Sequence, residues 1–314
     1  MTAYIIRRLI LIVPVMWLVA TVAFFLLHMT PGDPVAVLLG PDATTEQVDR
    51  MRAELGLNEP LMIQYVTWLW DVARLDLGTS LFLNMPVIDA ILERAQPTIL
   101  LTLSALIVAV GIGIPTGVIS AVRRGSAIDF GAMLGAMVGI SMPTFWLGLN
   151  LIFIFAVTLR WLPIGGYTPL LDDPVDSLKR MIMPAFTLGA FQAAFLARIT
   201  RSVMLDVLNE DYIRTARAKG LLERRVVIRH ALRNTMIPLV TVIGLSFALL
   251  IGGAVVTEQV FNIPGVGRLL IQAVLRRDFP LIQGIVLTIA FLYVIINLIV
   301  DVFYVFLDPR VHYS

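Results

Sequence analysis

One short stretch of the sequence groups acids, bases and a glycine in the order of a self-contained helix. Glu210 and Asp211 stand at its start, where carboxylates suit the positive end of the helix dipole. Arg217 and Lys219 stand at its end, and Gly220 is the predicted stop. Side chains of these types are suited to ion pairs and hydrogen bonds, within the chain or with a partner protein.

Residues suited to catalysis are scarce. The chain has no cysteine, which excludes disulfides, thiolate metal sites and a cysteine nucleophile. Its three histidines, His28, His230 and His312, are too far apart for a local metal motif. The sequence contains neither a Gly-x-x-x-x-Gly-Lys-Ser/Thr phosphate loop nor a His-Glu-x-x-His motif. We expect no catalytic residue, no metal and no cofactor bound by this chain.

The composition is that of a membrane protein. Hydrophobic residues make up 58% of the 314 and charged residues 15%, far from the balance of a soluble domain. The net charge of +2 is no nucleic-acid-binding footprint. We therefore expect membrane lipid, and no nucleic acid, among the partners.

Long apolar runs predict an all-α, polytopic membrane protein with six transmembrane helices, since a bilayer needs about 20 apolar residues per helix. We expect residues 1–30 to hold a tail and the first span, residues 31–97 an external helical segment, and residues 98–314 a core of five spans. The predicted spans are Leu9–Leu27, Thr98–Val122, Phe130–Leu159, Met181–Ala197, Met236–Val256 and Leu281–Val300.

Basic clusters predict the orientation. Arg7–Arg8, Arg123–Arg124 and the segment Arg198–Arg233 fall on one side of the six spans, which the positive-inside rule makes cytoplasmic. Both termini are then cytoplasmic, and residues 31–97, with ten acids against four arginines, lie outside. Arg268, Arg276 and Arg277 would lie outside, so the rule holds for most of the basic residues and not for all of them.

The external segment contains helix signals of its own. Thr44 and Gln47 form a capping box, and a second helix is predicted from Pro60, with Tyr65 and Trp68 on one side. This helical cap either packs against the membrane domain or contacts an external partner, and both roles are compatible.

Two further patterns concern the spans. Gly131, Gly135 and Gly139 recur at every fourth residue, which predicts a face for close helix packing. Pro115, Pro143 and Pro184 fall in or at the edges of spans and should kink or interrupt them.

The charged helix lies in a cytoplasmic loop, at about residues 205–235, between two spans. Asn209 is its predicted N-cap, and a second basic amphipathic piece, Leu221–Arg233, follows. A helix held in this way can pass a push from another protein into the membrane. The alternative is that these cations only obey the positive-inside rule, and charge alone does not separate the two.

The loop resembles the EAA loop of ABC importer permeases. Its three-residue block is Arg214–Ala216, its glycine is Gly220 and its end is Thr235–Pro238. The block does not spell Glu-Ala-Ala, and the distance from Gly220 to Pro238 exceeds that in sugar permeases. Both departures are typical of the branch that imports dipeptides, oligopeptides, nickel complexes and glutathione, in which Tyr212–Gly220 and His230–Asn234 read almost unchanged.

The resemblance covers essentially the whole chain. The long external segment after the first span is similar to that of the first permease of the pair. Further matching motifs are Pro31–Pro34, Leu55–Leu61, Asp76–Ser80, Glu258–Gly267, Arg277–Asp278 and Leu307–Arg310. It implies the type I importer permease fold in the bacterial inner membrane. It also implies a heterodimer with a second permease, two ATPase subunits that carry ATP and Mg, and a periplasmic or lipid-anchored binding protein. The implied ATPase contacts are Glu210, Asp211, Arg214, Thr215, Ala216, Arg217, Ala218, Lys219 and Gly220.

The solute pathway is less defined by the sequence. Polar groups in spans usually face a protein interior or a cavity, which makes Asn150, Gln192 and Asn297 candidates. The stretch Glu258–Gly267, with Phe261, Pro264 and Gly265, is a candidate external gate. We rank short peptides first as solute, with glutathione or a nickel complex as alternatives. A secondary active transporter is the rival class, but it would show more spans and internal repeats.

Overall fold

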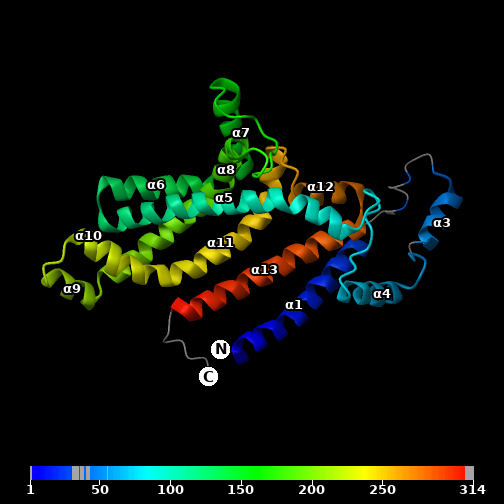
Figure 1. Cartoon of the computed structure of the whole chain (residues 1–314), viewed down its shortest axis with the longest axis horizontal. Helices are drawn as coiled ribbons and strands as arrows, with labels where there is room; N and C mark the ends of the chain where they lie inside the picture. Colours follow the sequence, from blue (N-terminus) through cyan, green and yellow to red (C-terminus); the bar gives the residue numbers. More distant parts are fainter. Residues whose placement is uncertain (1, 30–34, 36–38, 40–42, 55, 308–314) are drawn as a thin grey trace. The chain divides into compact units, whose positions relative to one another are not determined.

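The computed structural model describes residues 2–29, 35, 39, 43–54 and 56–307, so the motifs Pro31–Pro34 and Asp308–Arg310 lie outside the described residues. Every regular element among these residues is a helix (Figure 1). Five described helices are long and apolar enough to span a membrane, and the number rises to six if the bent pair Ala127–Ser141 and Thr144–Thr158 is counted as one span. The prediction of an all-α polytopic membrane protein is therefore confirmed.

The third predicted span is not one straight helix. Phe130–Leu159 forms α6 (Ala127–Ser141), then α7 (Thr144–Leu151), which continues into a π-helical segment, η1 (Ile152–Thr158). The two parts are bent by 103°, and Figure 1 shows α7 leaving the direction of α6. Pro143 causes the break, because it offers no N–H and holds the preceding residue in an extended conformation.

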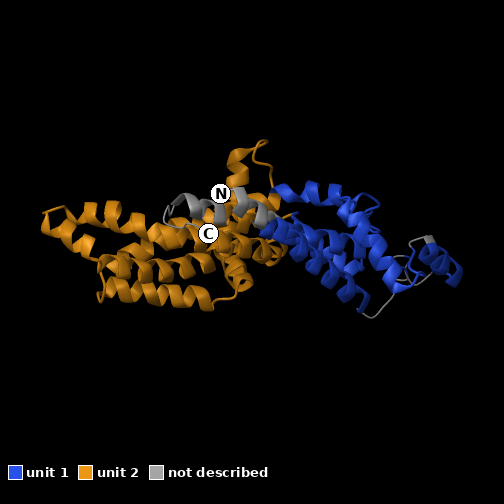
Figure 2. Ribbon diagram, turned by 90° about the horizontal axis from the view of Figure 1, so that it is seen from below, with its two compact units in different colours: residues 1–96, 264–294 blue, residues 97–263, 295–314 orange. Residues whose placement is uncertain are grey.

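The chain divides into two compact units that differ from the three segments expected (Figure 2). Unit 1 combines Met1–Gln96 with Pro264–Val294, and unit 2 combines Pro97–Ile263 with Ile295–Ser314. Segments far apart in the sequence therefore share a core.

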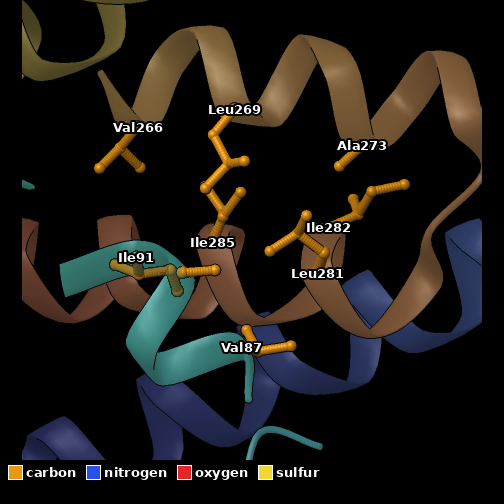
Figure 3. Packing of buried hydrophobic residues seen from close by; sticks show 9 residues of the cluster. Val87, Ile91, Val266, Leu269, Ala273, Leu281, Ile282 and Ile285 are labelled. Atoms are coloured by element: carbon orange, nitrogen blue, oxygen red, sulfur yellow. The ribbon is translucent and has the colours of Figure 1, made fainter. Parts of the chain in front are cut away.

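Unit 1 is built around the start of two long helices. It contains α1 (Thr2–Met29), α3 (Thr45–Glu54), α4 (Leu61–Ala73), α12 (Val266–Arg276) and the first parts of α5 (Val87–Val122) and α13 (Phe279–Leu307). In Figure 3, Val87 and Ile91 of α5 face Leu269 of α12 and Leu281 and Ile285 of α13. α5 begins eleven residues before the predicted apolar run at Thr98, because its first turns pack in this core.

A buried carboxylate ties two motifs of unit 1 together. Asp278 accepts hydrogen bonds from the Ser80 hydroxyl (2.5 Å) and the Phe82 amide (3.0 Å), and it also accepts from the Leu281 amide at the start of α13. The motifs Asp76–Ser80 and Arg277–Asp278, almost 200 residues apart, are thus neighbours.

The helices α3 and α4 follow the predicted signals. The Thr44 amide donates to the Gln47 side chain (2.9 Å) and the Gln47 amide to the Thr44 hydroxyl (3.3 Å), which confirms the capping box. Pro60 is the N-cap of α4. The rings of Tyr65 and Trp68 lie 5.3 and 5.4 Å from that of Phe24 on α1, so α4 does pack against a membrane helix.

Unit 2 holds the rest of α5 with α6, α7, α8 (Pro174–Leu208), α9 (Asp211–Ala218), α10 (Glu223–Arg225), η2 (Val226–Ala231) and α11 (Leu232–Val260). α5 and α8 approach closely, since a Cβ on Gly117 would lie 2.5 Å from Thr200. On α6, Gly139 meets Ala194, whereas Gly131 and Gly135 have no atom within 4 Å of such a Cβ. The predicted glycine face therefore packs within the chain only at Gly139.

Candidate functional site

The charged helix exists, but it begins later than predicted. α9 starts at Asp211, and its N-cap is Glu210, whose side chain makes no capping hydrogen bond. The prediction of Asn209 as N-cap is wrong, because Asn209 has helical backbone angles and ends α8. Its side-chain amide donates to the Leu205 carbonyl at 2.9 Å.

Gly220 ends α9 as predicted. Its φ of +77° lies in the left-handed region, and its amide donates to the Arg217 carbonyl at 2.9 Å. No atom lies within 4 Å of the place a Cβ would take. The preference for glycine therefore comes from the backbone conformation alone.

One side of α9 is seated on the ends of other helices. Ile213 and Ala216 are buried in a hydrophobic cluster with Ala121 of α5, Met204 of α8 and Val226 of η2. The Asn234 side chain of α11 also donates to the Tyr212 hydroxyl, at 2.7 Å. A displacement of α9 must therefore act on α5, α8 and α11 together, because interiors packed in this way are stiff.

The other side of α9 is exposed, and we call it the docking face after the ATPase contact that the sequence resemblance implies there. It contains Glu210, Asp211, Arg214, Thr215, Arg217, Ala218, Lys219 and Gly220, which is every implied ATPase contact except the buried Ala216.

Two exposed ion pairs lie on the docking face. Arg214 pairs with Asp211 at 3.2 Å, and Arg217 pairs with Glu223 of α10 at 2.7 Å. The hydrogen bonds to Glu223 raise the pKa of Arg217 above its usual value, so its charge is permanent. Exposed pairs of this kind contribute about 0.2–1 kcal/mol, and a partner's charges can replace them at little cost.

The comparisons with known proteins agree along the whole chain. Residues 113–313 match the family described as the binding-protein-dependent transport system inner membrane component, and residues 1–102 match its N-terminal counterpart. The chain belongs to this family. It is a permease of an ABC importer and a multi-pass protein of the inner membrane.

Similar proteins match this permease over their full length. It is 48% identical over 314 residues, 100% of both chains, to a permease of Brucella suis biovar 1 (strain 1330) whose name assigns it to a peptide transport system. It is 43% identical, again over 100% of both chains, to the glutathione transport system permease protein GsiC of Escherichia coli (strain K12). A structure of the MetNI methionine ABC transporter in inward-facing conformations matches 70% of this permease and 97% of its own chain, with a TM-score of 0.58 at 18% identity, which supports the fold.

The residues that follow α9 lead directly into the fifth membrane helix. A separate basic piece was expected after Gly220, but α10, η2 and α11 form one helix from Glu223 to Val260, with Pro238 inside it. The fifth predicted span, Met236–Val256, therefore lies inside a helix that begins thirteen residues earlier, at Glu223. η2 is a π-helical turn, a rare element that is frequent at functional sites.

The sequence analysis missed a buried ion pair of the permease. Asp129, at the start of α6, is 5% exposed and accepts two hydrogen bonds from Arg201 of α8. It also accepts from the Ser120 hydroxyl and the Gly125 amide, at the end of α5. The sequence shows no clear signal for this pair, because Arg123, Arg124 and Arg198 stand at the same helix ends.

The six pathway candidates of the permease fall into both units. In unit 2, the Asn150 amide donates to the Trp146 carbonyl (2.7 Å), Gln192 is 4% exposed, and Asn297 is half-buried. Phe261 is 1% exposed and belongs to a hydrophobic core. Pro264 and Gly265 precede α12 in unit 1.

Phe261 also anchors an irregular loop between η1 and α8. Its carbonyl accepts the Gly166 amide at 2.8 Å, and Gly165 packs so closely that a Cβ would overlap the same carbonyl. Arg180 of α8 donates to the Gly165 carbonyl at 2.7 Å. This loop is therefore fixed to both α8 and the end of α11.

Proposed function

We propose that this permease carries short peptides into the cell and that ATPase subunits drive it through the docking face of α9. The observation that supports this most is the position of α9. A helix with one exposed, charged face is seated on the ends of α5, α8 and η2, and the short turns at Asn209 and Gly220 hold it in place.

The proposed assembly has four further parts. A second permease forms the pathway with this one, two cytoplasmic ATPases bind ATP and Mg, and an external binding protein delivers the solute. The chain contains no phosphate loop of its own, so the energy arrives by contact. The family's description as binding-protein-dependent favours the external partner.

The proposed orientation places the docking face in the cytoplasm with both termini. Arg123–Arg124, Arg198 and Arg233 lie on the same side as α9 in the order of the spans, as the positive-inside rule requires.

Two groups of relatives support a peptide as solute. One relative is named for peptide transport and another for glutathione, which is itself a tripeptide. Both solutes carry a free ammonium and a free carboxylate on a small polar body. We therefore rank short peptides first and keep glutathione as the alternative to be tested.

The packing of α9 against α5, α8 and η2 suggests how movement of the ATPases reaches the membrane helices. When the ATPases close on ATP, they displace α9 against the cluster around Ile213 and Met204. α8 and α11, which pack along one another, then move with it, and the pathway between the two permeases opens outward.

Among the pathway candidates, Gln192 is the one that its surroundings favour most. Its side-chain oxygen is buried without a hydrogen-bond partner among the described residues. An unsatisfied buried polar group costs about 1–3 kcal/mol, so a partner in another state of the transporter would be stabilising. Asn150 and Asn297 are proposed as further polar contacts, and Phe261, Pro264 and Gly265 as the support of an external gate.

The test is transport by the complete complex. The complex is reconstituted in proteoliposomes with its binding protein, and ATP-dependent uptake of a labelled dipeptide is compared with that of glutathione. We expect dipeptide uptake that stops without ATP. Uptake independent of ATP would contradict the proposed energy coupling, and uptake of glutathione alone would contradict the peptide assignment.

A further inference from the structure

A cavity of about 310 Å³ lies within unit 1, between α1, α4 and the start of α13. Aromatic rings form one wall. Phe24 stacks on His28 with 4.1 Å between ring centroids, Trp68 lies 5.4 Å from Phe24, and Phe279 lies 6.1 Å from His28. Because the face of an aromatic ring attracts cations, such a wall suits a positively charged group.

The polar groups around the cavity are mostly hydrogen-bond acceptors. Glu59 and Asp71 are acidic residues of its lining. His28 uses Nδ1 to donate to a backbone carbonyl at 2.8 Å, so its neutral ring keeps only an acceptor, Nε2. The side-chain nitrogen of Gln64 donates to two backbone carbonyls, at 3.2 and 2.8 Å, so its side-chain oxygen is the group that can accept a hydrogen bond from a ligand. A ligand with several N–H donors and a positive charge complements this set.

One further amide, that of Gln283 on α13, also lines the cavity, and this residue is 4% exposed.

The outer side of α4 indicates where the ligand comes from. Met62, Val66 and Trp70 are largely exposed and follow one another at intervals of four residues, which places them in one row along the helix. Arg74 continues the row, with its guanidinium 4.6 Å from the centre of the Trp70 ring. An apolar row that ends in a cation is typical of a helix lying in the headgroup region of a membrane, where the cation meets lipid phosphate.

We propose that this cavity binds phosphatidylethanolamine from the leaflet that the Met29 end of α1 reaches. The primary ammonium enters the cavity and donates to Asp71, and the acyl chains lie along Met62 and Val66. Glu59, at the other end of α4, contributes negative charge to the cavity without contacting the ammonium. The phosphate lies toward Arg74. Phosphatidylcholine is a weaker ligand, because its trimethylated ammonium has no N–H to donate, and phosphatidylglycerol lacks the cation altogether.

The binding experiment uses the purified complex with its partner subunits and native mass spectrometry. Each of the three lipids is added at the same concentration. We expect phosphatidylethanolamine to bind with about tenfold preference over the other two, the factor that corresponds to 1.4 kcal/mol. The double variant Glu59→Gln/Asp71→Asn should lose this preference. The control Glu46→Gln/Asp49→Asn, which makes the same charge change on α3 outside the cavity, should keep it.

A second variant changes no charge. Thr67 is exposed and lines the cavity, so Thr67→Trp fills the space and should also displace phosphatidylethanolamine. Equal binding of all three lipids, or unchanged preference in both cavity variants, would overturn the proposal. Competition by free ethanolamine or a dipeptide at the concentration at which the lipid binds would show a site for soluble amines, and so would also overturn the assignment to a lipid.

Discussion

The guanidinium of Arg201 binds the carboxylate of Asp129 through two hydrogen bonds, Nε to Oδ1 at 2.7 Å and Nη2 to Oδ2 at 2.8 Å. This pair fixes α8 to α6, and the further bonds from Ser120 and Gly125 add the end of α5. α8 leads directly into α9. The three helix ends therefore form a firm support for the docking face.

The first prediction concerns this ion pair. Asp129→Asn leaves Arg201 without its charged partner, and breaking a buried pair costs about 3–5 kcal/mol. We expect a lower apparent Tm of the purified complex and fewer solute molecules imported per ATP hydrolysed, because α9 loses its fixed support. Asp176→Asn is the control, since its pair with Arg180 is partly exposed. An unchanged transport ratio in Asp129→Asn would show that the pair serves stability alone.

The second prediction concerns the end of α9. Gly220→Ala puts a side chain on a left-handed residue and costs about 1–2 kcal/mol, although the space around it is open. We expect reduced uptake through altered geometry of the docking face. Gly56→Ala is a matched control, with φ of +67° and equally open space in unit 1. If both variants transport equally well, the conformation of Gly220 has no part in coupling.

The third prediction separates packing from transport at Gln192. Gln192→Leu replaces an amide that lacks a partner for its oxygen, so stability should be unchanged or slightly higher. Uptake should fall if the amide meets the solute or a neighbour in another state. The measurement compares Tm with the initial uptake rate. Full uptake in the leucine variant would remove Gln192 from the pathway.

The fourth prediction concerns Phe261. Phe261→Ala empties a well-packed core site and should cost about 3–5 kcal/mol. It should also loosen the loop between η1 and α8, because Leu162 and Tyr167 of the loop pack against the core that contains Phe261, although the hydrogen bond from the Gly166 amide to the backbone carbonyl of residue 261 is kept. Limited proteolysis of the loop should become faster, while Phe261→Leu should remain close to the native protein. A proteolysis rate that does not change in the alanine variant would contradict this anchoring role.

Local signals in the sequence predicted local structure well. The capping box at Thr44 and Gln47 and the stop at Gly220 depend on neighbouring residues only, and both are present. The apolar runs located the membrane helices for the same reason. Asn209 was misjudged because a good N-cap residue can equally close the preceding helix, and only the packing of α8 decides which occurs.

Features that depend on distant residues could not be predicted in the same way. The early start of α5 requires a core shared with α12 and α13, which lie nearly 200 residues further along the chain. Asp129 and Arg201 are 72 residues apart, and neither shows from its neighbours that it is paired. The bend after α6 was anticipated at Pro143, but its size depends on the packing of α7.

The most direct test of the account asks whether an ATPase subunit contacts the docking face. Because the native chain has no cysteine, Ala218→Cys supplies a single exposed thiol on α9, and Asp49→Cys supplies one on α3 as a control. Both variants are treated in the complete complex with a short thiol-to-amine cross-linker. The account predicts an adduct with the ATPase subunit from Ala218→Cys and none from Asp49→Cys. Absence of an adduct at Ala218→Cys in a complex that still imports its solute would contradict it.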